Sequence, residues 1–256
     1  MAQINFNVLR NAADEPIRQE IRNINKTISW DQLDFLSEPH VACCLLVDTS
    51  GSMSAQGKID ELNQALHNFK ESVCQDPLSA RRVDVCVISF SSTVEVVTPF
   101  CPIMQFVPPT LTAGGSTSMG AGIRYALEAV HEQVRRYHDT GVECYKPFIL
   151  MITDGMPTDD MTDIELLIAQ REGEGRYGHL RFHAFGVKGA DMTLLARLTK
   201  RVLAINNNAF DEIFNWASKT MQIISHSRTS DVVTGSNLTG NMYAYDPATK
   251  KVPWSD

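Results

Sequence analysis

The stretch that decides the fold is LLVDTSGSM, residues 45–53. Its apolar residues end a run that is bounded by turn residues, and such a run indicates a buried strand. Asp48 stands where the strand ends, and Ser50 and Ser52 follow in a loop that Gly51 allows to turn tightly. A carboxylate and two hydroxyls at a strand end are the oxygen ligands that a hard cation such as Mg²⁺ prefers.

Apolar strand patterns alternate with amphipathic helix patterns along the rest of the chain. The pattern predicts strands at residues 41–47, 83–90, 93–98, 148–153, 181–187 and 202–205, and helices at 58–73, 119–137, 162–171, 192–199 and 210–224. This order predicts a doubly wound α/β fold, with helices on both faces of a mainly parallel sheet that has one antiparallel edge strand. We expect strand 93–98 at that edge, ended by Pro99, and the most apolar strand, 148–153, at the centre.

The N-terminal extension, residues 1–37, stands apart from this alternation. Alternating apolar residues at positions 4–8 predict a short strand. Asp14, Glu15 and Pro16 have the character of a helix start, and isoleucines recur at helical spacing after them. Two interpretations of this helix stay open: it packs on its own domain, or it docks onto a partner.

The remaining chain divides into a domain at residues 38–227 and a polar tail at 228–256. The tail lacks periodicity, so it is either partly disordered or held to the domain by its aromatic residues Tyr243, Tyr245 and Trp254.

Composition excludes several classes of protein. The formal net charge of −7 argues against a nucleic-acid partner, which usually requires a basic surface. The longest apolar runs are too short to span a bilayer, and no secretory signal pattern is present. The six cysteines form no C-x-x-C pair, so we expect reduced thiols in a cytoplasmic protein.

Two further loops offer oxygen ligands. One is GGSTSMGAGI, residues 114–123, in which Thr117 presents a hydroxyl at the start of a helix. The other is ITDGMPTDD, residues 152–160, in which Asp154 follows an apolar strand as Asp48 does. In a mainly parallel sheet ligands bind at the carboxyl ends of the strands, so we expect these loops to meet there.

These three loops resemble those of von Willebrand factor A domains, which include the integrin I domains. Residues 48–52 match the D-x-S-x-S motif of the family, Thr117 matches its metal-binding threonine and Asp154 its third-loop aspartate. The predicted element order from about residue 40 to 227 also agrees with the family's Rossmann-like fold. Within the family, TDGMPTDD (153–160) is most similar to bacterial cytoplasmic proteins of the TerY-like, tellurium-resistance branch.

The resemblance implies a metal-ion-dependent adhesion site that holds Mg²⁺, or Mn²⁺ or Ca²⁺ in its place. The implied metal ligands are Asp48, Ser50, Ser52, Thr117 and Asp154. The candidate residues for the rim of the site are Gly51, Ser118, Asp159 and Asp160, of which the two aspartates are alternatively caps of the following helix. A partner protein would present Asp or Glu to the metal and displace a bound water.

Three functions stay open at this stage. The first is a non-catalytic scaffold or interaction module, in a bacterial stress-response or defence system. The second is a Mg²⁺-dependent phosphohydrolase or phosphotransferase of the haloacid-dehalogenase type, although that motif requires an acid where this chain has Ser50. The third is a subunit of a chelatase or AAA-type complex whose motor is a separate chain, because no G-x-x-x-x-G-K-[ST] loop is present. The oligomeric state is not predicted.

Overall fold

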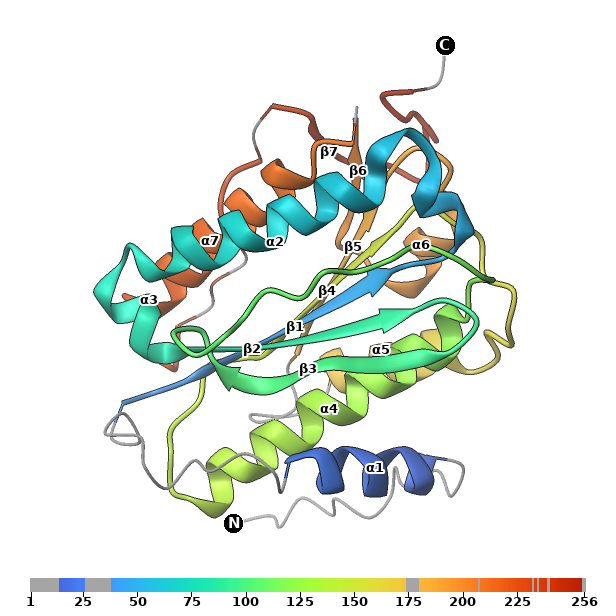
Figure 1. Cartoon of the computed structure of the whole chain (residues 1–256). Helices are drawn as coiled ribbons and strands as arrows, with labels where there is room; N and C mark the ends of the chain where they lie inside the picture. The colour runs from blue at the N-terminus through green and yellow to red at the C-terminus, as the bar shows by residue number, and fades with distance from the viewer. Residues whose placement is uncertain are drawn as a thin grey trace.

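The computed structural model describes residues 14–25, 38–173, 180–206, 208–231, 233, 235–238 and 240–254. Their centre is a seven-stranded sheet between two layers of helices (Figure 1). Its strands are β1 (Val41–Asp48), β2 (Val83–Phe90), β3 (Val94–Pro102), β4 (Phe148–Thr153), β5 (Arg181–Gly186), β6 (Val202–Ile205) and β7 (Met242–Ala244). Their spatial order is β3-β2-β1-β4-β5-β6-β7. The five inner strands are parallel, and β3 and β7 run antiparallel to their neighbours.

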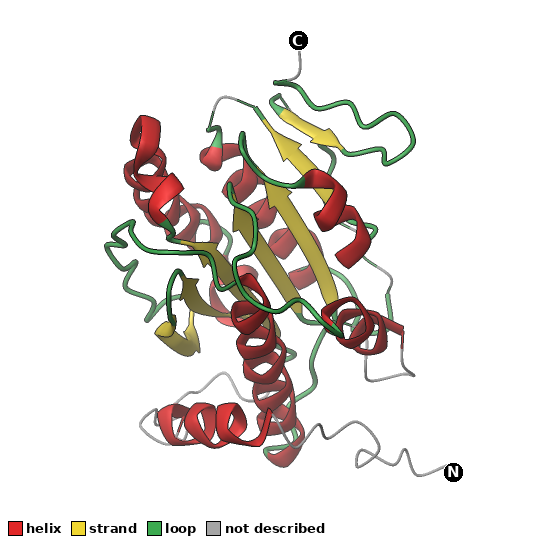
Figure 2. Ribbon diagram, turned by 90° about the vertical axis from the view of Figure 1, so that its right-hand side faces the viewer, coloured by secondary structure: helices red, strands yellow, loops and turns green. Residues whose placement is uncertain are grey.

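The helices divide between the two faces of the sheet (Figures 1 and 2). They are α1 (Glu15–Asn25), α2 (Lys58–Cys74), α3 (Pro77–Arg82), α4 (Met119–Asp139), α5 (Ile164–Gly173), α6 (Met192–Leu198) and α7 (Phe210–Ser225), with a 3-10 segment η2 (Gly51–Gly57) before α2. Alternate residues of a strand point to opposite faces. Leu45 and Val47 therefore join the core under α2 and α7, whereas Leu46 joins the core under α4, α5 and α6.

The predicted α/β architecture is confirmed, with β4 inside the sheet between β1 and β5. The structure adds a second antiparallel edge, because the tail contributes β7. Tyr245 and Trp254 pack against the core, which favours a tail held to the domain over a disordered one.

Three details of the predicted elements were wrong or missing. Strand β3 does not end at Pro99 but continues to Pro102, with shifts in its register against β2. A proline is tolerated there because an edge strand has one side without ladder hydrogen bonds. The short elements α3 and η2 were not predicted. The strand predicted at residues 4–8 lies outside the described residues.

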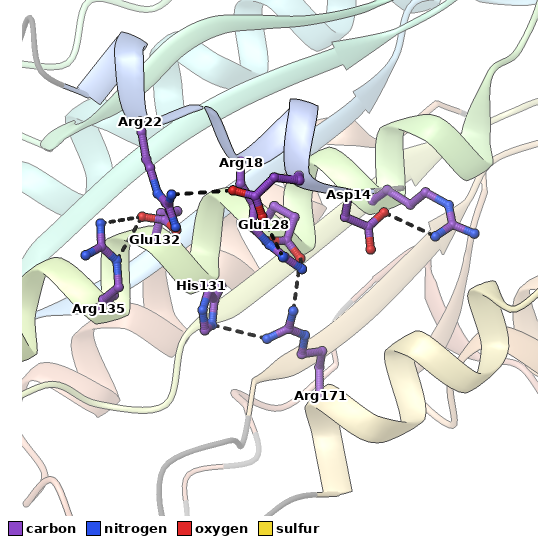
Figure 3. Close-up of polar contacts among 10 residues, drawn as sticks. Asp14, Arg18, Arg22, Glu128, His131, Glu132, Arg135 and Arg171 are labelled. Atoms are coloured by element: carbon purple, nitrogen blue, oxygen red, sulfur yellow. Dashed lines mark hydrogen bonds and ion pairs between the residues drawn. The ribbon is translucent and has the colours of Figure 1, made fainter. Parts of the chain in front are cut away.

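Helix α1 packs on α4 of its own domain, which is the first of the two interpretations. Figure 3 shows ion pairs between charged side chains of the two helices. Arg18 Nε lies 2.6 Å from Glu128 Oε2, and Arg22 Nη2 lies 3.1 Å from Glu132 Oε1. Ile21 adds an apolar anchor to the core.

The two glutamates also have partners outside α1. Arg171 of α5 lies 3.0 Å from Glu128, and Arg135 of α4 lies 2.7 Å from Glu132 (Figure 3). The acidic face of α4 is therefore charge-paired within the domain, and α1 adds a second set of partners to it.

Two composition-based expectations concern the cysteines and the membrane. All six cysteines are free thiols. In the part of the chain that the structure describes, no helix is both long enough and apolar enough to cross a membrane.

A buried histidine makes the stability of the fold depend on pH. His183 on β5 stacks with Phe148 at 5.7 Å and contacts Trp216 at 4.9 Å between ring centroids. Burial, with Arg201 and Arg181 nearby, lowers the pKa of His183 to about 3. The unfolded chain, with an ordinary histidine pKa near 6.5, therefore binds a proton that the folded chain does not bind until the pH falls to about 3.

Because of this residue, we expect the free energy of unfolding to decrease by up to about 1.4 kcal/mol for each pH unit as the pH falls below about 6.5. The His183→Phe variant removes the titrating ring but keeps an aromatic side chain, so its stability should fall less steeply over that range. Urea denaturation at pH 7, 6, 5 and 4 measures the two slopes. His67→Gln, at an exposed position on α2, is the control; equal slopes in wild type and His183→Phe would contradict the prediction.

Candidate functional site

The first wall of the candidate site is the loop after β1. Asp48 ends the strand with no exposed surface, and its Oδ1 accepts a hydrogen bond of 2.8 Å from the backbone N–H of Ser50. This bond turns the loop, so that Ser50 Oγ comes within 3.0 Å of Ser52 Oγ. The carboxylate and both hydroxyls thus belong to one tight turn.

The second wall is the loop after β4. Because β1 and β4 are adjacent parallel strands, their carboxyl ends meet. Thr153 Oγ1 donates to Asp48 Oδ2 at 2.6 Å, and Ser52 Oγ donates to Asp154 Oδ1 at 2.5 Å. Asp48, Ser50, Ser52 and Asp154 therefore form one connected set of oxygen atoms.

The third loop reaches the site by a different route from the one expected. It does not follow a parallel strand: β3 ends at the opposite end of the sheet, where Ile103 N–H donates to Val83 O. The chain then runs back along the molecule (Figure 1), anchored by the buried side chain of Phe106. Gly51 N–H donates to Gly115 O at 3.0 Å and joins the first and third loops.

Thr117 is brought to the other two walls by the loop after β4. Its N–H donates to Thr158 Oγ1 at 3.0 Å, and its carbonyl accepts from Thr158 N–H at 2.9 Å. A β-carbon on Gly155 would lie 3.2 Å from both Thr117 Oγ1 and Asp48 Oδ2. All five residues predicted as metal ligands therefore lie close together at the carboxyl end of the sheet.

The residues predicted for the rim have other contacts in the structure. Gly51 joins two of the loops, as described above. Ser118 Oγ donates to Ser92 O at 3.3 Å. Asp159 accepts from Gly120 N–H and Ala121 N–H, so it caps the preceding helix α4 rather than the following one. Asp160 accepts from the N–H and hydroxyl of Thr162, in the turn before α5.

Lys58 is the site residue that sequence reasoning missed. Its Nζ donates to Asp154 Oδ2 at 2.6 Å and to the carbonyl of Lys188 at 3.2 Å, and its side chain is only 8% exposed. A basic residue at the first position of a helix opposes the helix dipole. That unfavourable position at the start of α2 is the signal in the sequence that Lys58 has an anionic partner.

The electrostatics of the site are dominated by buried charges. Burial raises the pKa of Asp48, and hydrogen bonds from Ser50 and Thr153 oppose that rise. The formal charges of Asp48, Asp154 and Lys58 add up to −1. Such a site attracts a cation.

One oxygen–oxygen distance in the site also suits adjacent ligands of a small divalent cation. Adjacent ligands of octahedral Mg²⁺, each about 2.1 Å from the ion, lie about 3.0 Å apart. The Ser50 and Ser52 hydroxyls are 3.0 Å apart. Among the described residues, no three His, Cys, Asp or Glu side chains gather at a possible metal site. A cation held here would therefore need the hydroxyls as well as the two carboxylates.

Comparison with known proteins identifies the domain. The family model of the von Willebrand factor type A domain matches residues 44–219, a range that begins in β1, ends in α7 and contains all three loops. A search of curated protein sequences found no match.

Similar solved structures agree with this fold. One is the open conformation of the pilus adhesin SpaC from Lactobacillus rhamnosus GG, with a TM-score of 0.55 and 16% identity over 72% of this chain and 30% of that chain. Another is the D319A mutant of the PilB minor pilin from Streptococcus sanguinis, with a TM-score of 0.51 and 12% identity over 74% of this chain and 62% of that chain. This chain therefore spans less than two thirds of either protein, and at these identities the likeness concerns the fold alone.

Proposed function

Because the chain belongs to the von Willebrand factor type A domain family, we propose that it is a non-catalytic protein-interaction module whose contacts depend on a divalent metal ion. The observation that carries the proposal is the set of five oxygen-bearing side chains gathered in three neighbouring loops, with two hydroxyls at the spacing of adjacent Mg²⁺ ligands. Asp48, Ser50, Ser52, Thr117 and Asp154 would hold Mg²⁺, or Mn²⁺ or Ca²⁺ in its place.

The partner, in this proposal, presents an aspartate or glutamate to the ion. The formal charges of Asp48, Asp154 and Lys58 leave the site at −1, so a divalent ion makes it +1. A site of net positive charge attracts a carboxylate, and Mg²⁺ typically keeps waters that an incoming oxygen can displace.

The biological setting is proposed from the TDGMPTDD motif at residues 153–160. Its similarity to the TerY-like branch suggests a cytoplasmic scaffold in a bacterial stress response. A subunit of a chelatase or AAA-type complex is the alternative setting for the same interaction chemistry.

Affinity capture in Mg²⁺ and in EDTA tests the proposal. We expect the immobilised protein to retain specific partners in Mg²⁺ and to release them in EDTA, and the double variant Asp48→Ala/Ser50→Ala to retain none in either condition. The same preparations are assayed with a phosphate ester. Hydrolysis by the wild type but not by the double variant would contradict the non-catalytic proposal and favour a phosphohydrolase.

Gly155→Ala tests whether the ion binds between the loops that carry Asp48, Thr117 and Asp154. The new methyl group would lie 3.2 Å from both Thr117 Oγ1 and Asp48 Oδ2, so we expect it to lower Mg²⁺ affinity about tenfold or more by crowding the ligands. Gly114→Ala is the matched control, because a β-carbon there meets nothing within 4 Å. Isothermal titration calorimetry gives both affinities; an equal effect of the two substitutions would place the ion elsewhere.

A further inference from the structure

We infer that Lys58 is a built-in counter-cation that weakens binding of the divalent ion and strengthens attraction of the ion-loaded site for a carboxylate. The inference rests on the proposed metal-dependent function and assigns a role in it to a residue outside the ligand set.

The first observation is the place of the ammonium group. The two carboxylate oxygens of Asp154 have different partners among the described residues: Oδ1 accepts from Ser52 and Oδ2 from Lys58. Lys58 thus donates to Oδ2, the carboxylate oxygen that does not accept from the serine hydroxyl. Only Oδ1 remains on the side of the proposed ion, so Asp154 would bind through one oxygen while a positive charge sits on the other.

The second observation is that the lysine is held in this position. Its side chain is 8% exposed and that of Asp154 has no exposed surface. Its second acceptor is the carbonyl of Lys188, in the loop after β5. The next residue, Gly189, has φ of +116°, and a β-carbon there would lie 2.6 Å from Asp154 O. Glycine lets this loop approach Asp154 closely, and the approach brings the Lys188 carbonyl to the ammonium group.

The third step follows from Coulomb's law. A fixed positive charge on one ligand of a divalent ion repels that ion, and the repulsion is strong at contact distances in a buried site. Without Lys58 the empty site would carry −2 and bind the ion more tightly. The loaded site would then be neutral, whereas with Lys58 it carries +1. Lys58 therefore lowers the affinity of the site for the ion and raises the affinity of the loaded site for an anionic group.

Calorimetry with Mg²⁺ alone tests the first half of the inference. We expect Lys58→Met to bind Mg²⁺ at least about tenfold more tightly than the wild type, which corresponds to about 1.4 kcal/mol, and Lys58→Arg to stay close to the wild type. Lys70→Met removes the same charge from the same helix, about 18 Å further along its axis, and should leave the affinity unchanged. Equal or weaker binding by Lys58→Met would overturn the inference.

The stability of the variants is measured alongside. Removing one member of a buried ion pair commonly destabilises a protein, so each variant is first checked for cooperative thermal unfolding. If Lys58→Met does not fold, Lys58→Gln, which keeps an N–H donor without the charge, takes its place under the same expectation. In either neutral variant, saturating Mg²⁺ should raise the melting temperature by more than it does in the wild type.

Acetate, as a simple carboxylate, tests the second half. If it binds to the loaded site, replacing chloride by acetate at constant ionic strength raises the apparent Mg²⁺ affinity by linkage. We expect a clear rise in the wild type and in Lys70→Met, and a smaller one in Lys58→Met. Equal rises, or no rise in any of them, would overturn the claim about the carboxylate.

The outcomes separate this inference from the proposed function. If the wild type binds Mg²⁺ and Lys58→Met binds it no more tightly, the inference alone fails. If no variant binds Mg²⁺ although all are folded, the proposed function fails and the inference fails with it. If only the neutral variants bind, Lys58 opposes the ion as inferred, but the wild-type protein does not work through Mg²⁺.

Discussion

Replacing Asp48 by asparagine is expected to lower the affinity of the protein for Mg²⁺ by about 100-fold or more while the fold persists. The change removes one of the two negative charges that face the proposed ion, and charge interactions are strong in a buried site. The side-chain oxygen of asparagine can still accept the hydrogen bond from Ser50 N–H, so the turn after β1 keeps its main support. Calorimetry with Mg²⁺ measures the affinity, and thermal unfolding checks the fold.

Asp191→Asn is the matched control for this variant. Asp191 lies in the neighbouring loop after β5 and caps α6 by accepting a hydrogen bond of 2.9 Å from Leu194 N–H. Asparagine serves as a helix cap about as well as aspartate, so the control removes an equal charge without removing a proposed ligand. If Asp191→Asn lost as much Mg²⁺ affinity as Asp48→Asn, overall charge and not a specific ligand would govern Mg²⁺ binding.

The second large effect is expected at the other end of the sheet, where Asp84 lies at the beginning of β2 with no exposed surface. Its Oδ2 lies 2.9 Å from His40 Nδ1 and also accepts a hydrogen bond from the hydroxyl of Tyr137. Asp84→Ala removes the acceptor that these two buried groups share. We expect it to lower the free energy of unfolding by about 3–5 kcal/mol, as is typical when one member of a buried charged or hydrogen-bonded set is lost.

Urea denaturation measures this loss. Asp139→Ala, at a position on α4 where the aspartate side chain is 62% exposed, should change stability by less than about 0.5 kcal/mol. Asp84→Ala that still folds should bind Mg²⁺ as the wild type does, because the Asp84 cluster and the oxygen site lie at opposite ends of the strands. Unchanged stability would contradict the role of the cluster, and a selective loss of Mg²⁺ affinity would contradict the separation of the two sites.

The strands and most helices were predictable because their signals are local. Strands β2, β4 and β6 have the boundaries expected from the sequence, since a buried strand is a short apolar run between turn residues. The edges were harder to predict. Strand β7 has only three residues and two of them are exposed, so it lacks the apolar pattern of a buried strand. Its pairing with β6 depends on where the tail lies in space.

Some residues of the candidate site were also predictable from local sequence patterns, and others were not. Asp48 and Asp154 are detectable because each follows an apolar strand, and adjacent parallel strands end side by side. The contact of Lys58 with Asp154 joins residues 96 positions apart in the chain, so no local pattern contains it. Asp159 likewise caps the start of α4, at residues 38 and 39 positions before it, because the loop after β4 folds back onto that helix. Helix capping is usually sought in the residues next to a helix, and this cap comes from another loop.

A crystal structure of the protein with Mn²⁺ would show directly whether these oxygen atoms hold a divalent ion, because Mn²⁺ has a usable anomalous signal and takes oxygen ligands as Mg²⁺ does. We expect one strong anomalous peak within coordination distance of the Ser50 and Ser52 hydroxyls, on the Oδ1 side of Asp154, with Lys58 still on Oδ2. A peak at another place on the protein, or no peak at saturating Mn²⁺ with the Ser52–Asp154 and Lys58–Asp154 contacts intact, would contradict it.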